Sequence, residues 1–380
     1  RVLGLGLLEG GHAVGNRLDA RQGGRAGRER PRDEEDQRGA HAGSAEERGP
    51  LCAVLRDEFH IEHSTIQLEP EGFALAARCD AKVVGAKVYT IQIGTGDDVD
   101  MQDGVDLFAQ SWRPAAPRGA IVLVHGLKDH GTRYAELAQR LAADGLAVHA
   151  LDLRGHGRSA GERAFAADLG EYVADLAIYV ERVRASNPGA PLLLFGHSMG
   201  GAIATTYTLE HPVDGLILSA AALQLGPEVS PGLVKLTRKL GRKHPHWRVL
   251  KLKPKYFSRD PAVVADVNGA DPQVDTRKIP ASTAAGLIAA IDRIQADMEK
   301  LTVPVLILHG EDDRITPPDG SRNLHRRAGA RDKQLVIVPG AYHDLLHEPD
   351  HAAVLAAIDT FVAARLAASS PAADAAPAAP

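Results

Sequence analysis

The chain has 380 residues, 44% of them hydrophobic and 24% charged, which is enough apolar material for one large domain or two smaller ones. Its net charge of −5 exerts no general attraction on nucleic acid, and no apolar run reaches the roughly 18 residues that a membrane-spanning helix needs. We therefore expect no nucleic-acid partner. The two cysteines, too few for a disulfide framework, favour a cytoplasmic location.

Residues 1–86 differ in composition from the rest of the chain. Between Asp19 and Pro50 there is no Val, Ile, Leu, Met or aromatic residue, so this stretch cannot bury enough apolar surface to offset chain entropy. We predict that residues 1–86 are disordered or extraneous and that the working protein begins near Lys87.

Within this segment, Phe59–Glu69 predicts a short strand. These residues resemble the last strand of the cytoplasmic domain of cation diffusion facilitator transporters, over barely a dozen positions. His60, Glu62 and His63 are of metal-binding type, but we interpret them as exposed polar residues of a strand. We therefore expect no metal site there.

From Lys87 onward, strand-like and helix-like segments alternate. Two antiparallel strands, Val88–Ile93 and Val105–Trp112, are predicted to flank an acidic turn at Asp97–Gly104. Further strands are predicted at Arg118–Val124, Leu146–Asp152, Leu192–Phe195, Gly215–Ala220, Pro304–Gly310 and Lys333–Pro339, and helices at Tyr134–Ala143, Asp168–Ala185 and Ala202–Glu210. This order predicts an α/β fold with a mostly parallel central sheet and helices on both faces.

The alternation lapses between Leu223 and Leu301, where several prolines interrupt short helical patches. We predict that residues 223–301 form a cap inserted into an α/β domain made of residues 87–222 and 302–367. The cap is basic: Lys235–Lys255 holds nine Lys or Arg and no acidic residue, interleaved with leucines and Trp247. Residues 368–380 are rich in Ala and Pro and predict a disordered tail.

The pattern Gly196-His-Ser198-Met-Gly200 sits between a predicted strand and a predicted helix. In that context a G-x-S-x-G pattern indicates a nucleophile elbow, a sharp turn that exposes the serine hydroxyl. The glycines leave room for the helix to approach the strand, and the helix N-terminus favours developing negative charge. Ser198 is therefore the candidate nucleophile, and we expect His197 to point away from it along the elbow.

A serine hydroxyl needs a general base, and the base needs an acid to orient it. Of the 17 histidines, His343 is the best placed, because it follows the last predicted strand in a glycine-containing loop. The strand Pro304–Gly310 is followed by Glu311, Asp312 and Asp313, and spacing alone does not decide among these three acids. The order serine, acid, histidine is that of α/β hydrolases.

An oxyanion hole requires two backbone N–H groups directed at one point. One candidate is the amide of Met199, the residue after the nucleophile. The other is the amide of Leu127, in the loop His125-Gly126-Leu127 that follows the first predicted parallel strand. We expect these two amides to stabilise the negative charge that forms during acyl transfer.

Residues 87–367 resemble the monoacylglycerol lipase family of α/β hydrolases. The matching motifs are HGLKDHGTRY from His125, DLRGHGRSAGER from Asp152, GHSMGG from Gly196, KLTVP from Lys300, GEDDR from Gly310 and GAYH ending at His343. The resemblance implies that Asp313 is the catalytic acid. It also makes Asp129, Arg133 and His347 candidates for binding the glycerol end of the substrate. Animal members typically carry Glu where this chain has Asp129, and the second histidine after the catalytic one lies one residue later here, at His347.

By this resemblance the chain is a serine carboxylester hydrolase that cleaves monoacylglycerols to fatty acid and glycerol through an acyl-enzyme. We expect a lipid ester as substrate and no cofactor or catalytic metal. The basic cap suggests peripheral contact with an anionic membrane surface. The alternatives are a lysophospholipase or broad-specificity carboxylesterase, and a non-catalytic binding protein that keeps the hydrolase fold.

Overall fold

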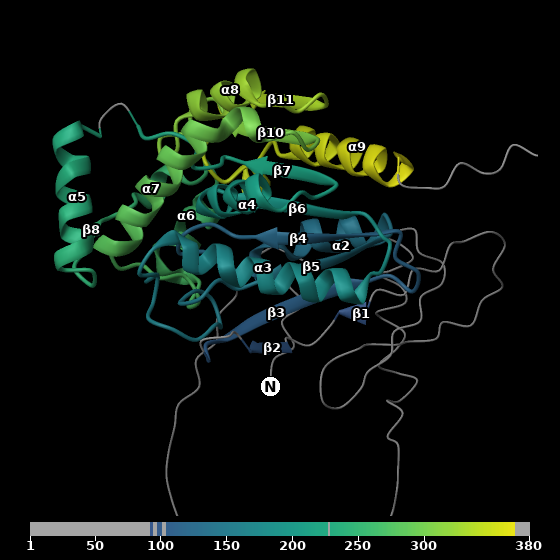
Figure 1. Cartoon of the computed structure of the whole chain (residues 1–380), viewed down its shortest axis with the longest axis horizontal. Coiled ribbons are helices and arrows are strands. Elements are labelled where there is room, and N and C mark those ends of the chain that lie inside the picture. Colours follow the sequence, from purple (N-terminus) through teal and green to yellow (C-terminus); the bar gives the residue numbers. More distant parts are fainter. Residues whose placement is uncertain (1–91, 94–96, 101–103, 227–228, 369–380) are drawn as a thin grey trace, which may run out of the picture. The chain divides into compact units, whose positions relative to one another are not determined.

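A computed structural model describes residues 92–93, 97–100, 104–226 and 229–368 of the chain (Figure 1). The predictions for residues 1–86, which include the strand at Phe59–Glu69 and both cysteines, lie outside the described residues. The same holds for residues 369–380 of the predicted tail.

The described residues build one large sheet and a small one. The large sheet has nine strands, eight of them in the order β1-β3-β5-β4-β6-β7-β10-β11, while β2 pairs with β3. The six parallel strands are β5 (Leu146–Leu151), β4 (Gly119–Val124), β6 (Leu192–His197), β7 (Gly215–Ser219), β10 (Val305–Gly310) and β11 (Lys333–Val338). Because they are parallel, their carboxyl ends meet at one edge of the sheet, which is where ligand sites form in such folds.

Side chains alternate between the two faces of the sheet, and each face is covered by helices. In β4, for example, Val122 joins one buried cluster and Ile121 joins the other. The first cluster is completed by α3 (Leu169–Ser186), α4 (Met199–Glu210), α7 (Ala281–Asp297) and α8 (Pro318–Arg327), and the second by α2 (Ala135–Ala143) and α9 (Ala352–Ala368). The predicted α/β fold with a mostly parallel sheet and helices on both faces is confirmed.

The antiparallel strands at one edge of the large sheet differ in one respect from the prediction. β3 (Asp106–Arg113) pairs antiparallel with β5, and β1 (Gln92–Ile93) pairs antiparallel with β3. The prediction of a turn over Asp97–Gly104 is wrong at its start, because Asp97–Asp100 forms β2 and pairs antiparallel with β3. Backbone pairing with a neighbouring strand outweighs the weak strand preference of aspartate.

The range predicted as a cap contains α5 (Pro231–Lys243), β8 (Arg248–Leu250), η2 (Pro254–Tyr256), α6 (Pro261–Ala265), η3 (Asp266–Ala270), β9 (Ile279–Pro280) and α7. β8 and β9 form the small antiparallel sheet. Helix α5 lies beside α7, and α7 packs on α3 and α4 (Figure 1). The approach is close: a Cβ built on Gly286 of α7 would lie 2.8 Å from the backbone nitrogen of Leu169.

Two further elements position the site: η1 (Gly131–Tyr134), which follows the loop after β4, and η5 (Leu345–His347), which follows the loop after β11. Among the described helices, none is both long and apolar enough to cross a bilayer.

Candidate active site

Ser198 lies in a sharp turn between β6 and α4, in a strained backbone conformation with φ 54° and ψ −120°. The turn requires its glycines. A Cβ built on Gly196 would lie 2.6 Å from the carbonyl oxygen of Gly200, and one built on Gly200 would lie 2.2 Å from that of Val124. The helix begins at Met199 rather than at Ala202 as predicted, because Gly200 and Gly201 belong to its first turn. This geometry is that of a nucleophile elbow.

Three side chains from three strand ends form a chain of hydrogen bonds. Ser198 Oγ lies 2.9 Å from His343 Nε2, and His343 Nδ1 lies 2.7 Å from Asp313 Oδ2. An ionised carboxylate only accepts, so Nδ1 carries the imidazole proton and Nε2 accepts from the serine hydroxyl. All three side chains are buried. The arrangement can remove the proton from Ser198 and hold it on an imidazole that is already oriented.

The carboxylate of Asp313 is fixed by its own loop. It accepts hydrogen bonds from the Ile315 amide at 2.7 Å and from the Thr316 hydroxyl at 2.8 Å. Burial alone raises the pKa of Asp313, but the imidazoles of His343 and His309 outweigh this and lower it below its ordinary value. Glu311 and Asp312 are exposed. Only the third acid after the strand therefore reaches the histidine.

Sequence reasoning missed His309 and Thr316. His309, the residue before the last one of β10, is completely buried and has its Nε2 3.2 Å from Asp313 Oδ2. The motif that contains Asp313 offered the only signal for them, since both residues flank it in sequence. The ring of His197, which we expected to point away from Ser198, packs beside the base, with its centroid 4.8 Å from that of His343. Burial lowers the pKa of His197 to about 4, so it packs there as a neutral ring.

The loop after β4 lies against the nucleophile. A Cβ built on Gly126 would lie 3.2 Å from the Cβ of Ser198, so glycine allows the loop to come this close. Among the described residues, neither the Leu127 amide nor the Met199 amide donates a hydrogen bond. Two unused N–H groups beside a nucleophile have the chemistry of an oxyanion hole.

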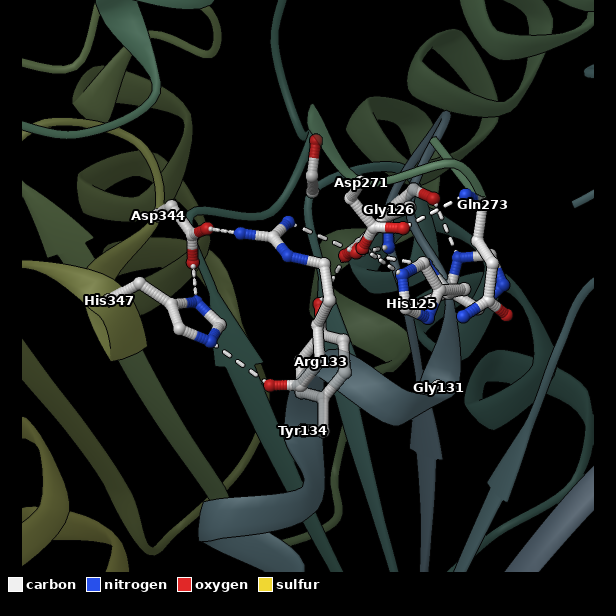
Figure 2. Close-up of polar contacts among 12 residues, drawn as sticks. His125, Gly126, Gly131, Arg133, Tyr134, Asp271, Gln273, Asp344 and His347 are labelled. Atoms are coloured by element: carbon white, nitrogen blue, oxygen red, sulfur yellow. Dashed lines mark hydrogen bonds and ion pairs between the residues drawn. The ribbon is translucent and has the colours of Figure 1, made fainter. Parts of the chain in front are cut away.

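A second cluster of polar side chains holds the loop after β4 in place by hydrogen bonds (Figure 2). Asp129 accepts from the amides of Gly126 and His130, from Arg133 at 3.1 Å and from the Tyr134 hydroxyl at 2.8 Å. A carboxylate has about four acceptor sites, so this one is saturated. Arg133 holds the pKa of Asp129 below its usual range, against the effect of burial.

Arg133 bridges Asp129 to the loop that carries His343. Its Nη2 donates to Asp344 at 2.7 Å, and Asp344 lies 2.8 Å from His347 Nδ1, as Figure 2 shows. His347 Nε2 donates in turn to the Arg133 carbonyl at 3.0 Å. Both ring nitrogens of His347 therefore face acceptors. Burial opposes the charged form, but Asp344 prevails and raises the pKa of His347. Sequence reasoning missed Asp344, although it directly follows the candidate base.

A cavity of about 200 Å³ opens beside this loop. One wall consists of Leu127, Lys128, Asp129 and Arg133, and the opposite wall comes from residues 251–257 and 267–276 of the cap. Phe257, in that wall, packs edge-on against the His343 ring at 5.6 Å. Asp129 and Arg133 therefore border a hollow next to the candidate base. His347 does not line it and instead borders a smaller hollow with Leu346 and Leu355.

Within the described part of the chain, no group of three or more His, Cys, Asp or Glu side chains is arranged to hold a metal ion. Independently of this, the hydrogen-bonded side chains and unused backbone amides around Ser198 have the chemistry of nucleophilic acyl transfer.

Comparisons with known proteins agree with this geometry. Residues 115–350 match the family described as "Serine aminopeptidase, S33". The monoacylglycerol lipase of Mycolicibacterium smegmatis is 39% identical over 69% of this chain and 95% of its own length. Human monoglyceride lipase is 35% identical over 65% of this chain and 82% of its own length. A crystal structure of Paleococcus ferrophilus monoacylglycerol lipase superposes with a TM-score of 0.63 at 32% identity, covering 68% of this chain and 99% of the other.

Proposed function

The chain belongs to the monoacylglycerol lipase-like family of α/β hydrolases, and we propose that it hydrolyses monoacylglycerols to fatty acid and glycerol through an acyl-enzyme on Ser198. The observation that carries the proposal is the hydrogen-bonded series Ser198–His343–Asp313 at the carboxyl ends of parallel strands. A binding role requires none of these contacts, and two relatives of 39% and 35% identity act on monoacylglycerols by name.

In the proposed first half-reaction, Ser198 Oγ attacks the ester carbonyl while His343 Nε2 takes its proton. The oxygen of the tetrahedral intermediate accepts from the amides of Leu127 and Met199, which have no other partner among the described residues. His343 then gives its proton to the departing glycerol oxygen, and the acyl group stays on Ser198.

In the second half-reaction a water molecule attacks the acyl carbonyl, and His343 accepts the proton of this water. Collapse of the second intermediate releases the fatty acid and returns the proton to Ser198. Asp313 keeps the imidazole in the required tautomer throughout and stabilises its charged form, because its carboxylate lies against Nδ1.

The cavity beside Leu127 is the proposed site of the glycerol end. Arg133 uses two of its five N–H groups in the bonds to Asp129 and Asp344, which leaves donors for a glycerol hydroxyl. All acceptor sites of Asp129 are already used by donors of the chain itself, so we propose that Asp129 orients Arg133 and the loop 125–127. His347 does not line the cavity, and we propose that it acts through Asp344 and the Arg133 carbonyl as a positioning residue.

A panel of esters tests the proposal. We expect wild-type kcat/KM to be highest for long-chain monoacylglycerols, compared with diacylglycerols, lysophosphatidylcholine and p-nitrophenyl esters. A fluorophosphonate probe should label Ser198, and Ser198→Ala should abolish labelling and lower turnover roughly 10³-fold or more. Labelling with a preference for lysophospholipids or short esters would favour the alternative esterase functions. Absence of both labelling and hydrolysis would favour a binding protein.

For the approach to lipid, we propose that α5 and β8 rest on an anionic membrane surface. Four large apolar side chains of this region are about half exposed: Leu233, Leu236, Trp247 and Leu250. They lie among the cationic residues Lys235, Lys239, Arg242 and Lys243, and each cation near an anionic surface contributes about 1 kcal/mol.

Changing these four cations to Gln should weaken binding to anionic liposomes and leave hydrolysis of a soluble p-nitrophenyl ester unchanged. High salt should reproduce the loss in the wild type, because it screens surface charge. A wild type that binds anionic and neutral liposomes equally at low salt would overturn the docking proposal while leaving the catalytic one intact.

A further inference from the structure

The cavity beside the loop 125–127 is lined by two lysines that the mechanism above does not use. Lys128 lies in the loop itself, between Leu127 and Asp129, and Lys251 comes from the cap opposite. Among the described residues, no carboxylate lies within ion-pair distance of either ammonium. Both charges are therefore available to something that occupies the cavity.

The third cation of the cavity wall is already neutralised. Arg133 lies between Asp129 and Asp344, with ion pairs of 3.1 Å and 2.7 Å (Figure 2). The Asp275 carboxylate attracts the Lys128 ammonium, but it is hydrogen-bonded to Arg277 at 2.8 Å. The positive charge without a direct partner at this cavity thus comes from Lys128 and Lys251.

Lys128 is held in an unusual backbone conformation for a lysine, with φ 64°, in the left-handed region that favours Gly or Asn. It is half-buried, and burial lowers its pKa to about 8, with Asp275 acting in the opposite direction. Lys128 is therefore a partly desolvated residue that lines the cavity where the alcohol part of the ester is proposed to bind.

We propose that this cavity binds a phosphate group on the alcohol part of the substrate, so that the enzyme cleaves acylglycerol phosphates as well as neutral monoacylglycerols. Lys128 is the specificity-determining contact and Lys251 assists from the exposed rim. Two ammonium groups match the charge of a phosphomonoester, whose oxygens are strong acceptors. The proposal rests on the proposed ester hydrolysis at Ser198, and the phosphate itself stays intact.

Binding can be measured without catalysis. Using Ser198→Ala protein, titration calorimetry with glycerol 3-phosphate and with glycerol should show tighter binding of the phosphate. Adding Lys128→Asn removes the charge while keeping a residue that tolerates the left-handed conformation. We expect it to weaken glycerol 3-phosphate binding about tenfold, as for a lost hydrogen bond to a charged group. Equal affinity for the two ligands, or no response to Lys128→Asn, would overturn the proposal.

Lys300→Gln is the matched control, because Lys300 is an exposed lysine paired with Asp297 and does not line the cavity. It should leave both affinities unchanged. Lys251→Gln should reduce glycerol 3-phosphate affinity less than Lys128→Asn, since Lys251 is exposed and its interactions are more strongly screened.

Hydrolysis separates this proposal from the one on which it rests. The substrates are 1-acylglycerol and 1-acylglycerol 3-phosphate with the same acyl chain, in non-ionic micelles. The kcat/KM for the phosphate ester divided by that for the neutral ester should fall about tenfold in Lys128→Asn. If the neutral ester is cleaved and the ratio does not change, the phosphate site is wrong and the catalytic proposal stands. If neither ester is cleaved but glycerol 3-phosphate binding still depends on Lys128, the catalytic proposal is wrong and the anion site stands.

Discussion

Helices α4 and α5 have similar lengths and opposite surroundings. Ten of the 12 residues of α4 are buried, from Met199 to Thr208. None of the 13 residues of α5 is buried, and Leu233 and Leu236 on it are about half exposed. Close packing around α4 holds Ser198 in one position. On α5, apolar and cationic side chains remain accessible at the surface.

The close packing around α4 extends to the charges beside it. Asp313, Asp129 and Asp344 are buried, and each is bound by donors from several parts of the chain. Removing one partner from such a group leaves a buried charge without compensation, which is costly. Around α5, most cations lie in water and contribute little to folding. Substitutions in the two regions should therefore differ greatly in effect.

The largest expected effect concerns two neighbouring aspartates. Asp313→Asn should lower kcat about 10³- to 10⁴-fold, because an amide no longer holds His343 in the tautomer that accepts the Ser198 proton. Asp312→Asn is the matched control, since Asp312 is adjacent and exposed, and it should retain near wild-type kcat. Steady-state kinetics on a monoacylglycerol checks both. If Asp312→Asn abolished activity and Asp313→Asn did not, the assignment of the acid would be wrong.

A smaller effect, on stability, compares one glycine from each helix. A Cβ on Gly200 of α4 would lie 2.2 Å from the Val124 carbonyl oxygen, whereas a Cβ on Gly232 of α5 would meet nothing closer than Ser230 Oγ at 3.9 Å. Gly200→Ala should lower the free energy of unfolding by about 3 kcal/mol or more. Gly232→Ala should raise it by a few tenths to about 1 kcal/mol, because alanine is the better helix former.

Urea unfolding of the two glycine variants measures both changes. A Gly200→Ala protein as stable as the wild type would show that the elbow can relax, and the contrast between the two helices would then be weaker than the distances suggest.

The last prediction is a dependence of stability on pH. Burial lowers the pKa of His125, His149 and His197 to about 4, and that of His156 to about 3. These rings are neutral in the fold, while an unfolded chain protonates them below about pH 6.5. Stability is therefore complete above pH 6.5 and is lost as the pH falls towards 4. Each ring contributes a slope of about 1.4 kcal/mol per pH unit.

His347 acts in the opposite direction, since its pKa is raised and its contribution is greatest in acid. The four rings with lowered pKa outnumber it, so the net change on acidification is a loss. His149→Gln should make the loss between pH 6.5 and 4.5 less steep, whereas His244→Gln, at an exposed position of the cap, should not. Urea unfolding across this pH range checks both variants, and identical slopes would contradict the buried-histidine explanation.

Much of the geometry of the candidate active site could be predicted from the sequence, because it depends on local order. An apolar strand followed by a glycine-flanked serine has few conformations open to it, and parallel strands bring their carboxyl ends to one edge. Ser198 and His343 were identified on these grounds, and the structure places their side chains within hydrogen-bond distance. The family resemblance singled out Asp313, and the structure places it against His343.

What the pattern of residues alone could not determine was which side chains meet after folding. Glu311, Asp312 and Asp313 all carry a carboxylate close to the end of β10. Only the turn after the strand, which buries Asp313, decides which of the three reaches His343. The sequence does not show what covers each helix: α7 packs on α3 and α4, whereas α5 contacts α7 and leaves Leu233 and Leu236 about half exposed. Lys128 and Lys251 lie far apart along the chain, and they share a cavity because residues between 251 and 276 line it together with the loop after β4. Hydrophobic burial and hydrogen bonding act between neighbours in space, so these contacts were decided by the tertiary structure.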